Sequence, residues 1–343
     1  MVIVPVAAYL GAMTRPGSPP NPAVTVRLEP IAADLRRVEA ALHESVQTSD
    51  PFLADVAAHL IGAGGKRIRP TLTLCAAYAA GGAEPAAEAA ITGSVSVELV
   101  HLGSLYHDDV IDEAETRRGV PSVNARWSNI VAILAGDFLL ARASSLAASL
   151  GADVASLLAE TIGELCRGQV LELQHLFDVD RSEERYLSAI EGKTAALFAT
   201  SCRVGGMVSG VSDPTLDALT RFGRHLGMCF QIVDDVLDIT ATDDRLGKPA
   251  GKDMLEGVYT LPVIYALNDS PALRELLGRP IDNEQLAEAR ELASANGAVD
   301  LALSVARSHA VKAADALDGA EGLDARVCEE LGSLVDGLVT RES

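Results

Sequence analysis

Aromatic residues are scarce in this 343-residue chain, and acidic residues outnumber basic ones. Phe, Trp and Tyr make up 4% of the sequence, whereas Ala and Leu are abundant, a composition that favours helices over strands. The formal net charge of −20 argues against a nucleic-acid partner, because a phosphate backbone attracts a basic surface. An anionic small substrate is compatible with this charge if local basic groups or metal ions neutralise it.

Cysteine pairs and long apolar runs are also missing. The five cysteines are scattered without C-x-x-C spacing, so we interpret them as small buried residues in a reducing compartment. No uninterrupted apolar run reaches the ~18 residues of a membrane span. The apolar residues 2–13 contain Pro5 and follow no basic segment, which argues against a signal peptide. We therefore expect a cytoplasmic protein without a transmembrane segment.

Helical signals recur from residue 30 onward, whereas residues 1–29 contain five prolines and little periodicity. We interpret 1–29 as a loose N-terminal extension and 30–343 as a single domain, since no Pro- or Ser-rich linker interrupts the latter. Capping residues and prolines predict helix starts at Asp50-Pro51, Ser212-Asp213-Pro214 and Ile281-Asp282-Asn283-Glu284.

Two apolar stripes predict long helices. Apolar residues recur every three to four positions across 213–239 and across 91–106, which is the spacing of one face of an α-helix. Alternating runs of β-branched residues between hairpin turns, the usual sign of strands, are not found in the sequence. The predicted fold class is therefore all-α.

Two nearly matching acidic octets stand out against this background. Residues 105–112 are Leu-Tyr-His-Asp-Asp-Val-Ile-Asp, and residues 231–238 are Gln-Ile-Val-Asp-Asp-Val-Leu-Asp. Each octet therefore contains Asp-Asp-x-x-Asp within an apolar stretch. Two such patterns in one chain indicate two facing sets of hard oxygen ligands, as Mg²⁺ and a diphosphate would need.

The spacing of these aspartates suits a divalent cation. On a helix, the first and last Asp of each octet share one face, and the middle Asp lies about 100° round. Like charges at this spacing destabilise a helix by roughly 0.2–0.5 kcal/mol per pair, and the penalty grows in apolar surroundings. A bound cation would offset it. The candidate metal ligands are Asp108, Asp109, Asp112, Asp234, Asp235 and Asp238.

Two other interpretations of the acidic octets stay open at this point. A solvated helix face would explain one octet, although two are harder to explain in that way. A helical metal-dependent phosphohydrolase would use His107 and Asp108 together with His101, but that scheme leaves the second octet without a role. An EF-hand is excluded, because its D-x-D-x-D-G loop and closing Glu are absent from the sequence.

Basic residues cluster near the acidic octets in sequence. The segment Gly64-Gly65-Lys66-Arg67-Ile68-Arg69-Pro70 joins glycines, which allow close backbone approach to phosphate, to three cations. Smaller clusters are Arg117-Arg118, Lys193-Thr194 and Gly247-Lys248. Each cluster alone is an ordinary surface feature, but their recurrence predicts a cavity in which Mg²⁺ and basic side chains neutralise a diphosphate.

A metal-bound diphosphate can be hydrolysed by water or lost as a leaving group. Hydrolysis needs a general base beside an activated water, whereas departure needs stabilisation of the diphosphate charge and an apolar wall facing the carbocation. The acidic helix faces continue into apolar surface with small residues. This favours ionisation of an apolar diphosphate.

With these motifs the chain resembles the trans-isoprenyl diphosphate synthases, or polyprenyl synthetases. The resemblance runs from about residue 31 to Arg341. It rests on the glycine-basic segment, the first aspartate-rich motif, Arg117-Arg118, Lys193-Thr194, the second aspartate-rich motif and Gly247-Lys248, in that order along the chain. It implies the isoprenoid synthase fold, a homodimeric all-α bundle of long helices around a central cavity. It also implies a Mg²⁺-dependent prenyltransferase that condenses isopentenyl diphosphate onto an allylic prenyl diphosphate.

The resemblance also implies roles for single residues. Three Mg²⁺ would bridge the two aspartate motifs and the allylic diphosphate, with Asp108, Asp112 and Asp234 as main ligands and the other three aspartates acting through water or geometry. Lys193 and Arg117 would join these three ligands as catalytic residues. The allylic diphosphate would be held by Arg117, Lys193, Gln231 and Lys248, with Thr194 as a further substrate contact, and isopentenyl diphosphate by Lys66, Arg69, His101 and Arg118.

By the same resemblance, product length follows the bulk of residues just before the first aspartate motif. Gly103 and Ser104, five and four positions before Asp108, are both small. We therefore expect an open cavity floor and a product longer than geranylgeranyl diphosphate. The alternative is that these residues only allow close helix packing, with the floor set by a neighbouring helix or the partner subunit.

Related functions without chain elongation fit the sequence less well. Class I terpene cyclases share the implied fold but lack the Gly-Gly-Lys-x-x-Arg segment. A non-catalytic subunit of a heteromeric prenyl synthase would show eroded aspartate motifs, and both motifs here are intact. An elongating enzyme would release a long apolar product, which is compatible with transient membrane contact.

Overall fold

The structure, a computed structural model, describes residues 29–82, 84–240, 250–295 and 297–339. Over these residues the fold is almost entirely helical, which confirms the all-α prediction. A π-helical turn, η1 (Glu191–Ala195), joins α9 to α10, and the strands described are β1 (Thr116–Arg117) and β2 (Val120–Pro121). The helices are α2 (Glu29–Ser45), α3 (Pro51–Gly62), α4 (Ile68–Ala79), α5 (Glu88–Ile111), α6 (Val123–Arg126), α7 (Asn129–Ser149), α8 (Ala152–Leu173), α9 (Glu183–Ile190), α10 (Ala196–Ser209), α11 (Asp213–Thr240), α13 (Lys252–Leu255), α14 (Leu261–Asp269), α15 (Pro271–Leu276), α16 (Asn283–Ser294), α17 (Ala298–Leu317) and α18 (Ala325–Val339).

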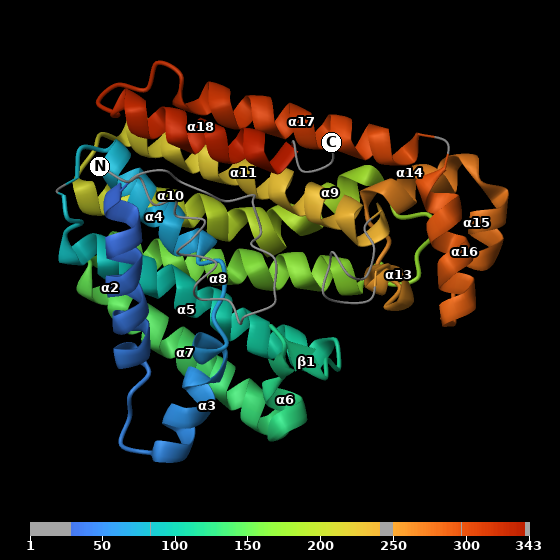
Figure 1. Ribbon diagram of the computed structural model, residues 1–343, viewed down its shortest axis with the longest axis horizontal. Helices are drawn as coiled ribbons and strands as arrows, with labels where there is room; N and C mark the ends of the chain where they lie inside the picture. The colour runs from blue at the N-terminus through green and yellow to red at the C-terminus, as the bar shows by residue number, and fades with distance from the viewer. Residues whose placement is uncertain (1–28, 83, 241–249, 296, 340–343) are drawn as a thin grey trace.

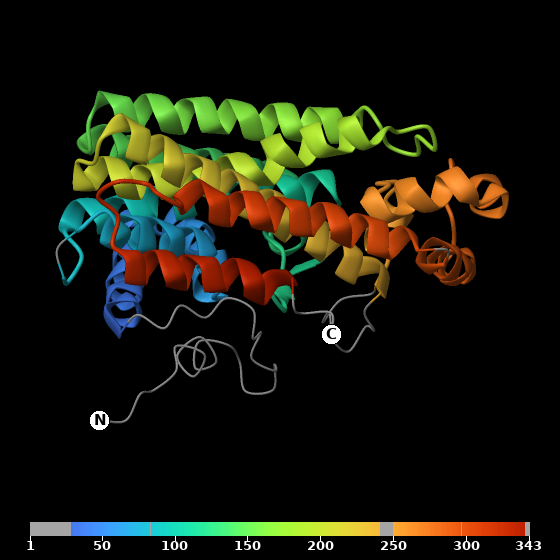
Figure 2. The ribbon, with the colours of Figure 1, turned by 90° about the horizontal axis from the view of Figure 1, so that it is seen from above.

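The long helices lie side by side in a bundle (Figure 1). α5 packs against α7 and α4, α10 packs against α4, α8 and α11, and α17 packs along α11. The short helices α14, α15 and α16 gather at one end of the bundle, and Figure 2 shows α17 and α18 next to one another along its side. The two acidic motifs lie at the C-terminal ends of α5 and α11, and both of these helices pack against α10.

The helix starts follow the capping signals in the sequence. Asp50 accepts hydrogen bonds from the first amides of α3, whose first residue is Pro51. Asp282 and Gln285 form a capping box at the start of α16, a reciprocal pairing that satisfies two backbone donors. α11 begins at Asp213. All three predicted starts are therefore confirmed, and so are the two predicted long helices, α5 and α11.

Glycines let the central helices approach one another closely. A Cβ added to Gly205 of α10 would lie 2.3 Å from the Thr73 carbonyl oxygen of α4. A Cβ added to Gly223 of α11 would lie 2.6 Å from the Phe198 carbonyl oxygen of α10. Because no side chain fits at either point, α10 packs tightly against both α4 and α11.

α7 is long and apolar enough to cross a membrane by length and composition alone, and 33% of its most apolar window is buried. Ile130, Ile133 and Leu134 on this helix are 71%, 43% and 60% exposed. One such helix is weak evidence for a membrane span, because core helices have the same length and composition. The absence of a transmembrane segment therefore stays a prediction.

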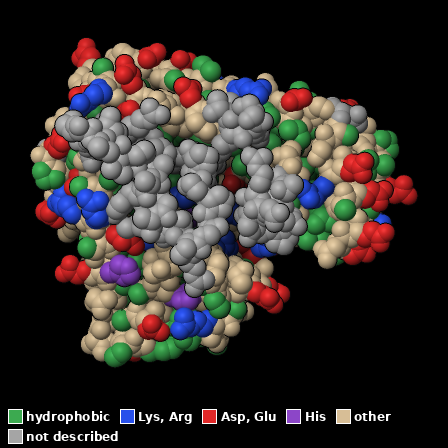
Figure 3. Space-filling view, viewed as in Figure 1, with side chains coloured by type: hydrophobic (Ala, Val, Ile, Leu, Met, Phe, Trp, Pro, Cys, Tyr) green, Lys and Arg blue, Asp and Glu red, His purple; other side chains and the backbone are tan. Residues whose placement is uncertain are grey.

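The predicted division into an extension and a single domain also stays a prediction, because residues 1–28 lie outside the described part of the chain. α2 begins at Glu29, one residue before the predicted start of the domain. Acidic side chains lie around the edge of the face seen in Figure 3, with Lys and Arg among them, in keeping with the net charge of −20.

Candidate active site

The first acidic motif forms the last turn of α5. Asp108 is half-buried, and Asp112 is the C-terminal cap, its amide donating to the Asp108 carbonyl at 2.8 Å. Burial raises the pKa of Asp108 to about 6; Lys193 opposes this rise and the Asp112 carboxylate adds to it. Two carboxylates that repel one another at the negative end of a helix dipole form a site that a cation would stabilise.

The middle aspartate of this motif is turned into the protein. Asp109 is fully buried, and both Nε and Nη2 of Arg117 donate to its Oδ1 at 2.7 Å. Its Oδ2 is buried without a hydrogen-bond partner among the described residues. Arg117 is therefore anchored to the first acidic motif, as its predicted role beside the diphosphate requires, and only Oδ2 of Asp109 is left for the predicted metal contact.

A hairpin that the sequence analysis did not foresee presents the two arginines. β1 and β2 pair with Arg117 opposite Val120. The two turn residues, Arg118 and Gly119, have φ of 53° and 74°, the left-handed conformation that two-residue hairpin turns of this kind require. Arg117 is thereby directed to Asp109, and Arg118 to a different element.

Arg118 lies against the glycine-basic segment. Its Nη1 donates to the Leu60 carbonyl at 3.3 Å and to the Gly64 carbonyl. A Cβ added to Gly65 would lie 2.7 Å from the same Nη1, and Gly65 has a φ of 155°, a backbone conformation that favours glycine. The structure therefore brings Arg118 next to the segment that carries Lys66, as the resemblance implies for a shared diphosphate subsite.

His101 and Arg69 lie in the same basic region. Burial lowers the pKa of His101 well below its ordinary value, and Arg69, then Arg118, lower it further. Burial also lowers the pKa of Arg69 to about 10, and its guanidinium lies 5.1 Å from the centre of the Phe198 ring. A neutral imidazole among charged arginines suits the binding of an anion.

Arg67, the remaining cation of the glycine-basic segment, has a structural role. Its Nε and Nη2 bind Glu39 at 2.8 Å, and its Nη1 binds Glu98 at 3.0 Å. Burial opposes the charge, but the hydrogen bonds that Arg67 donates to these carboxylates, and their negative charges, raise the pKa of Arg67 above its ordinary value. Arg67 therefore ties α4 to α2 and α5.

Lys193 faces the first acidic motif from the π-helical turn η1. Its Nζ donates to Glu172 of α8. Burial opposes the charge of Lys193, but Glu172 and Asp108 raise its pKa above the ordinary value. π-Helical turns are common at functional sites. Here the turn brings a charged ammonium to Asp108, the predicted metal ligand.

A glycine pair sets the position of η1 against α8. A Cβ added to Gly168 would lie 2.2 Å from the Lys193 amide nitrogen, and a Cβ added to Gly192 would lie 2.8 Å from the Glu164 carbonyl oxygen. Only glycines therefore allow these backbones to cross at this distance. This close crossing places Lys193 within reach of Glu172.

The second acidic motif also has a buried middle aspartate. The Tyr186 hydroxyl donates to Asp235 Oδ2 at 2.6 Å, and Gln231 Nε2 donates to Asp235 Oδ1 at 2.7 Å. The Thr194 hydroxyl donates to Gln231 Oε1 at 2.7 Å. Burial raises the pKa of Asp235 above its ordinary value, against these donors. Gln231 and Thr194, two predicted substrate contacts, are thus joined in one network.

The outer aspartates of the second motif differ in exposure. Asp234 is exposed, whereas Asp238 is buried and its Oδ2 accepts from the Asp253 amide at 3.4 Å. Asp234 is therefore the member of this motif that is open to a ligand from solvent. Lys248, a predicted contact of the allylic diphosphate, lies outside the described residues.

The described residues fit a metal that binds together with its substrate. They contain no group of three or more His, Cys, Asp or Glu side chains close enough to hold an ion alone. Asp108 and Asp112 nevertheless place two carboxylates one helical turn apart, and burial, together with the Asp112 charge, raises the pKa of Asp108 to about 6. Mg²⁺ commonly takes one or two carboxylates and completes its shell with substrate phosphate and water.

The phosphohydrolase interpretation is not favoured by the histidines. His107 Nε2 lies 3.3 Å from the Ile133 carbonyl and 3.3 Å from Asp137 Oδ1, both on α7. His101 lies among arginines instead. A mixed histidine and carboxylate metal site around Asp108 is therefore not formed by the described residues.

Gly103 does not line an open floor, so that part of the product-length prediction is wrong. A Cβ added to Gly103 would lie 3.1 Å from the Gly136 carbonyl oxygen and 3.1 Å from Leu140 Cγ, both on α7. Its small size allows α5 and α7 to pack closely, which is the alternative that the sequence left open. Ser104 is half-buried, and its hydroxyl donates to the His101 carbonyl at 2.9 Å.

Glu172 and Tyr186 are site residues that the sequence analysis missed. Neither belongs to a repeated motif, and no spacing links Glu172 to Lys193 or Tyr186 to Asp235 before the chain folds.

A pocket of about 220 Å³ opens beside the first acidic motif and has both acidic and apolar walls. It is lined by Ile111, Asp112, Glu113, Gln169, Glu172, Leu173, Leu176, Glu256 and Val258.

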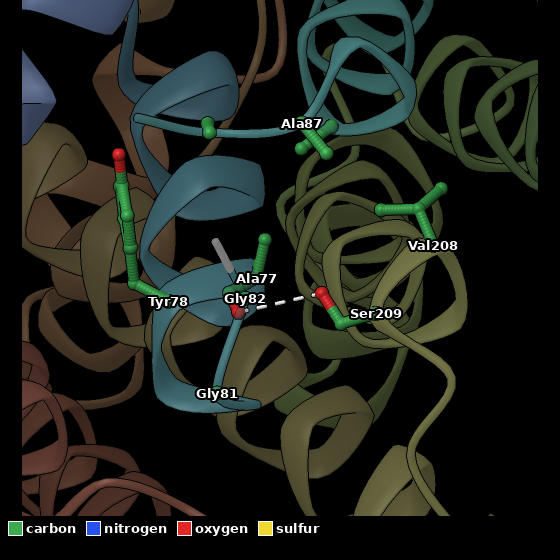
Figure 4. Close-up of a pocket in the computed structure, with 9 residues that line it drawn as sticks. Ala77, Tyr78, Gly81, Gly82, Ala87, Val208 and Ser209 are labelled. Atoms are coloured by element: carbon green, nitrogen blue, oxygen red, sulfur yellow. Dashed lines mark hydrogen bonds between the residues drawn. The ribbon is translucent and has the colours of Figure 1, made fainter. Parts of the chain in front are cut away.

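Another pocket, of about 240 Å³, lies at the far end of α4 (Figure 4). Ser209 donates there to the Ala77 carbonyl at 3.3 Å, and the Tyr78 hydroxyl donates to Asp34. All described lining residues are uncharged: Ala77, Tyr78, Gly81, Gly82, Ala86, Ala87, Ala90, Val208 and Ser209. This pocket has no cations for a diphosphate and is not part of the candidate site.

Comparison with known proteins agrees with this geometry. The chain is 40% identical over 316 residues to a nonaprenyl diphosphate synthase of Mycobacterium tuberculosis, with 91% of this chain and 93% of that protein covered. Its fold matches a Caulobacter crescentus polyprenyl synthase solved with calcium and isoprenyl diphosphate, with a TM-score of 0.84, 34% identity, and 91% and 95% of the two chains covered.

The chain is also similar to a second solved structure, to which it is as identical in sequence as to the nonaprenyl diphosphate synthase. It is a geranylgeranyl pyrophosphate synthase of Corynebacterium glutamicum, with a TM-score of 0.78, 40% identity, and 91% and 96% of the two chains covered. The family model for polyprenyl synthetases matches residues 50–295. With this match and these relatives, and with both aspartate motifs and the described basic residues held in one bundle, the chain belongs to the polyprenyl synthetase family.

Proposed function

We propose that this protein is a trans-polyprenyl diphosphate synthase that adds isopentenyl diphosphate units to an allylic diphosphate by 1′-4 coupling. The observation that carries the proposal is the position of Lys193 on a separate element: its Nζ donates to Glu172, and Glu172 lines one pocket together with Asp112 of the first acidic motif. Arg118 and the glycine-basic segment form a basic region with His101 and Arg69. Acid for a metal and base for phosphate thus meet in one place.

Two diphosphate subsites follow from this arrangement. Arg117, Lys193, Thr194 and Gln231 lie with the acidic motifs and would hold the allylic diphosphate, together with Lys248. Lys66, Arg69, His101 and Arg118 lie with the glycine-basic region and would hold isopentenyl diphosphate. Two separate sets of diphosphate-binding residues are what a reaction between one ionising substrate and one acceptor substrate needs.

The reaction that fits these subsites begins with heterolysis of the allylic C1–O bond, whose electron pair leaves with the diphosphate. Lys193 and Arg117 stabilise the negative charge that grows on the leaving oxygen. The isopentenyl double bond attacks the allylic cation and forms the new C–C bond, and the departing diphosphate accepts the proton that is lost. When bound, Mg²⁺, which we propose as three ions held by the aspartates, neutralises the diphosphate charge.

A product longer than geranylgeranyl diphosphate is part of the proposal. It is supported by the nonaprenyl synthase relative. Gly103 gives no support, because it packs against α7. Chain length is therefore a property to measure directly.

The test is incubation with Mg²⁺, farnesyl diphosphate and labelled isopentenyl diphosphate, with product length measured by mass spectrometry. We expect a ladder ending in one product longer than geranylgeranyl diphosphate, and no product when EDTA replaces Mg²⁺. If the product stops at geranylgeranyl diphosphate, the proposed elongation reaction is supported and the predicted product length is contradicted. No incorporation with geranyl, farnesyl or geranylgeranyl primers would contradict the proposed function and favour a partner subunit or a hydrolase.

We also propose that the protein is a homodimer. The exposed apolar face of α7, formed by Ile130, Ile133 and Leu134, suits burial against a second copy, because these residues lie three and four positions apart on one face of the helix. The same face would otherwise have to be covered by lipid. A cytoplasmic location, with transient membrane contact during product release, stays a prediction.

A further inference from the structure

A series of side-chain contacts links the buried Arg181 to Gln231 and Thr194 at the candidate site. The series starts at Arg181, whose guanidinium lies 5.5 Å from the centre of the Tyr186 ring. It continues from the Tyr186 hydroxyl to Asp235 at 2.6 Å and from Asp235 to Gln231 at 2.7 Å. It ends with the Thr194 hydroxyl on Gln231 Oε1 at 2.7 Å. Four elements thus meet in one line: the loop before α9, α9, α11 and η1.

The inner end of this series is out of reach of any substrate. Arg181 and Tyr186 are 4% and 1% exposed, and Asp235 is 4% exposed. Both carboxylate oxygens of Asp235 accept hydrogen bonds from protein side chains. Asp235 therefore acts on the site through Gln231, which is half-buried and open to a ligand.

The hydrogen bonds to Asp235 and Thr194 fix the orientation of the Gln231 side-chain amide. The Asp235 carboxylate can only accept a hydrogen bond, so Nε2 of Gln231 faces it, and Oε1 of Gln231 accepts from the Thr194 hydroxyl. Nε2 has two N–H groups, and one is used by Asp235. The other N–H is then the group that Gln231 offers to an anion.

From this geometry we infer that Tyr186 is a positioning residue for the allylic diphosphate: it holds Asp235 so that Gln231 presents an N–H donor to the substrate. The inference rests on the proposed function for the identity of the substrate. Without the Tyr186 hydroxyl, Asp235 keeps a single donor and is free to turn. The Gln231 amide can then rotate and present its oxygen, which repels a diphosphate.

The test is Tyr186→Phe, which removes one buried oxygen atom and keeps the ring. The dissociation constant of farnesyl diphosphate with Mg²⁺ is measured by calorimetry in the absence of isopentenyl diphosphate, so turnover is not needed. We expect it to rise about tenfold, which is the factor that ~1.4 kcal/mol corresponds to. In the elongation assay, KM for the allylic substrate should rise while KM for isopentenyl diphosphate stays within about twofold, because the basic region is untouched.

Tyr78→Phe is the matched control. Tyr78 is also buried and also donates to a buried carboxylate, Asp34. It lies nine residues along α4 from Arg69, about 14 Å at the rise of an α-helix. A general loss of stability caused by removing a buried tyrosine hydroxyl would appear in both variants. Weaker diphosphate binding should appear only in Tyr186→Phe.

Thr194→Val, alone and combined with Tyr186→Phe, completes the test. If both residues act through one amide, the effects on the dissociation constant should not multiply in the double variant. Unchanged binding in Tyr186→Phe, or an equal rise of both KM values, would refute the positioning role. A wild-type protein that binds farnesyl diphosphate but does not elongate it would contradict the proposed function and leave the binding comparison decisive for Tyr186.

Discussion

At the scale of single residues, the aspartates of each motif divide into an inner and an outer set. The middle ones, Asp109 and Asp235, are buried and accept hydrogen bonds from Arg117 and from Tyr186 with Gln231. On a helix, the middle residue lies about 100° from the first, so it points into the bundle when the first points out. The repeated octet therefore buries its middle aspartate twice, but the last aspartates differ: Asp112 is half-buried, whereas Asp238 is buried.

The first aspartates are expected to carry the metal-dependent step. Asp108→Asn and Asp234→Asn should each lower kcat by about 10³-fold, the scale of a lost group that stabilises a charged transition state. Steady-state elongation assays, with circular dichroism to verify the fold, check this. Asp300→Asn, on the exposed first turn of α17, is the control and should match wild type. Activity retained in either motif variant would contradict the metal role.

At the scale of elements, close crossings of glycine pairs position the functional side chains. Gly168→Ala should destabilise the protein by about 1–3 kcal/mol, because its Cβ would overlap a backbone that has no room to move, here the Lys193 amide at 2.2 Å. Activity should fall with it, since η1 shifts away from Glu172. Urea denaturation and elongation assays measure both effects.

Gly163→Ala on the same helix is the matched control for the crossing. A Cβ there would meet only the flexible end of Arg167, at 3.9 Å. Alanine in a helix interior is favoured over glycine by roughly 0.5–1 kcal/mol, so this variant should be equally or more stable and fully active. Equal destabilisation by Gly168→Ala and Gly163→Ala would contradict the claim that the close crossing of α8 and η1 requires a glycine.

The contact between α11 and α17 should make stability depend on pH. His225 Nδ1 and His309 Nδ1 lie 3.1 Å apart. Burial lowers the pKa of His225 and lowers that of His309 to about 4, and each is further lowered by Lys312. An unfolded histidine titrates near ~6.5. As pH falls from about 6.5 towards 4, the unfolded chain takes up protons that the folded one does not, so the free energy of unfolding should fall.

His309→Gln keeps a polar partner for His225 and removes one of these protonations. Its free energy of unfolding, measured in urea between pH 7.5 and 5, should fall less steeply than that of wild type. His43→Gln, at an exposed histidine on α2, should leave the slope unchanged. Parallel pH slopes for wild type and His309→Gln would contradict the role of the pair.

At the scale of the whole molecule, the apolar face of α7 must be covered. In the proposed homodimer, Leu134→Glu would place a charge in the interface and should convert the dimer to a monomer. Analytical ultracentrifugation measures this directly. Leu301→Glu, at a residue on α17 that is 54% exposed, is the control and should leave the assembly unchanged. A wild-type monomer that floats with lipid vesicles would instead favour a membrane role for α7.

The local features of this protein can be predicted from the order of its residues. Capping residues such as Asp50 and Asp282 and the apolar stripe of α11 specify helices through contacts within a few residues. The two aspartate motifs and the glycine-basic segment were evident for the same reason, since helical spacing alone decides which carboxylates share a face.

Which distant residues meet depends on how the helices pack. Lys193 is paired with Glu172, and Tyr186 with Asp235, because glycine crossings and a π-helical turn bring separate helices together. Gly103 is a case in which the sequence alone misleads. The sequence shows that this residue is small, but not that its neighbours are Gly136 and Leu140 of α7. A side chain's function depends on what lies across from it, and helix packing sets that partner only when the whole core is assembled.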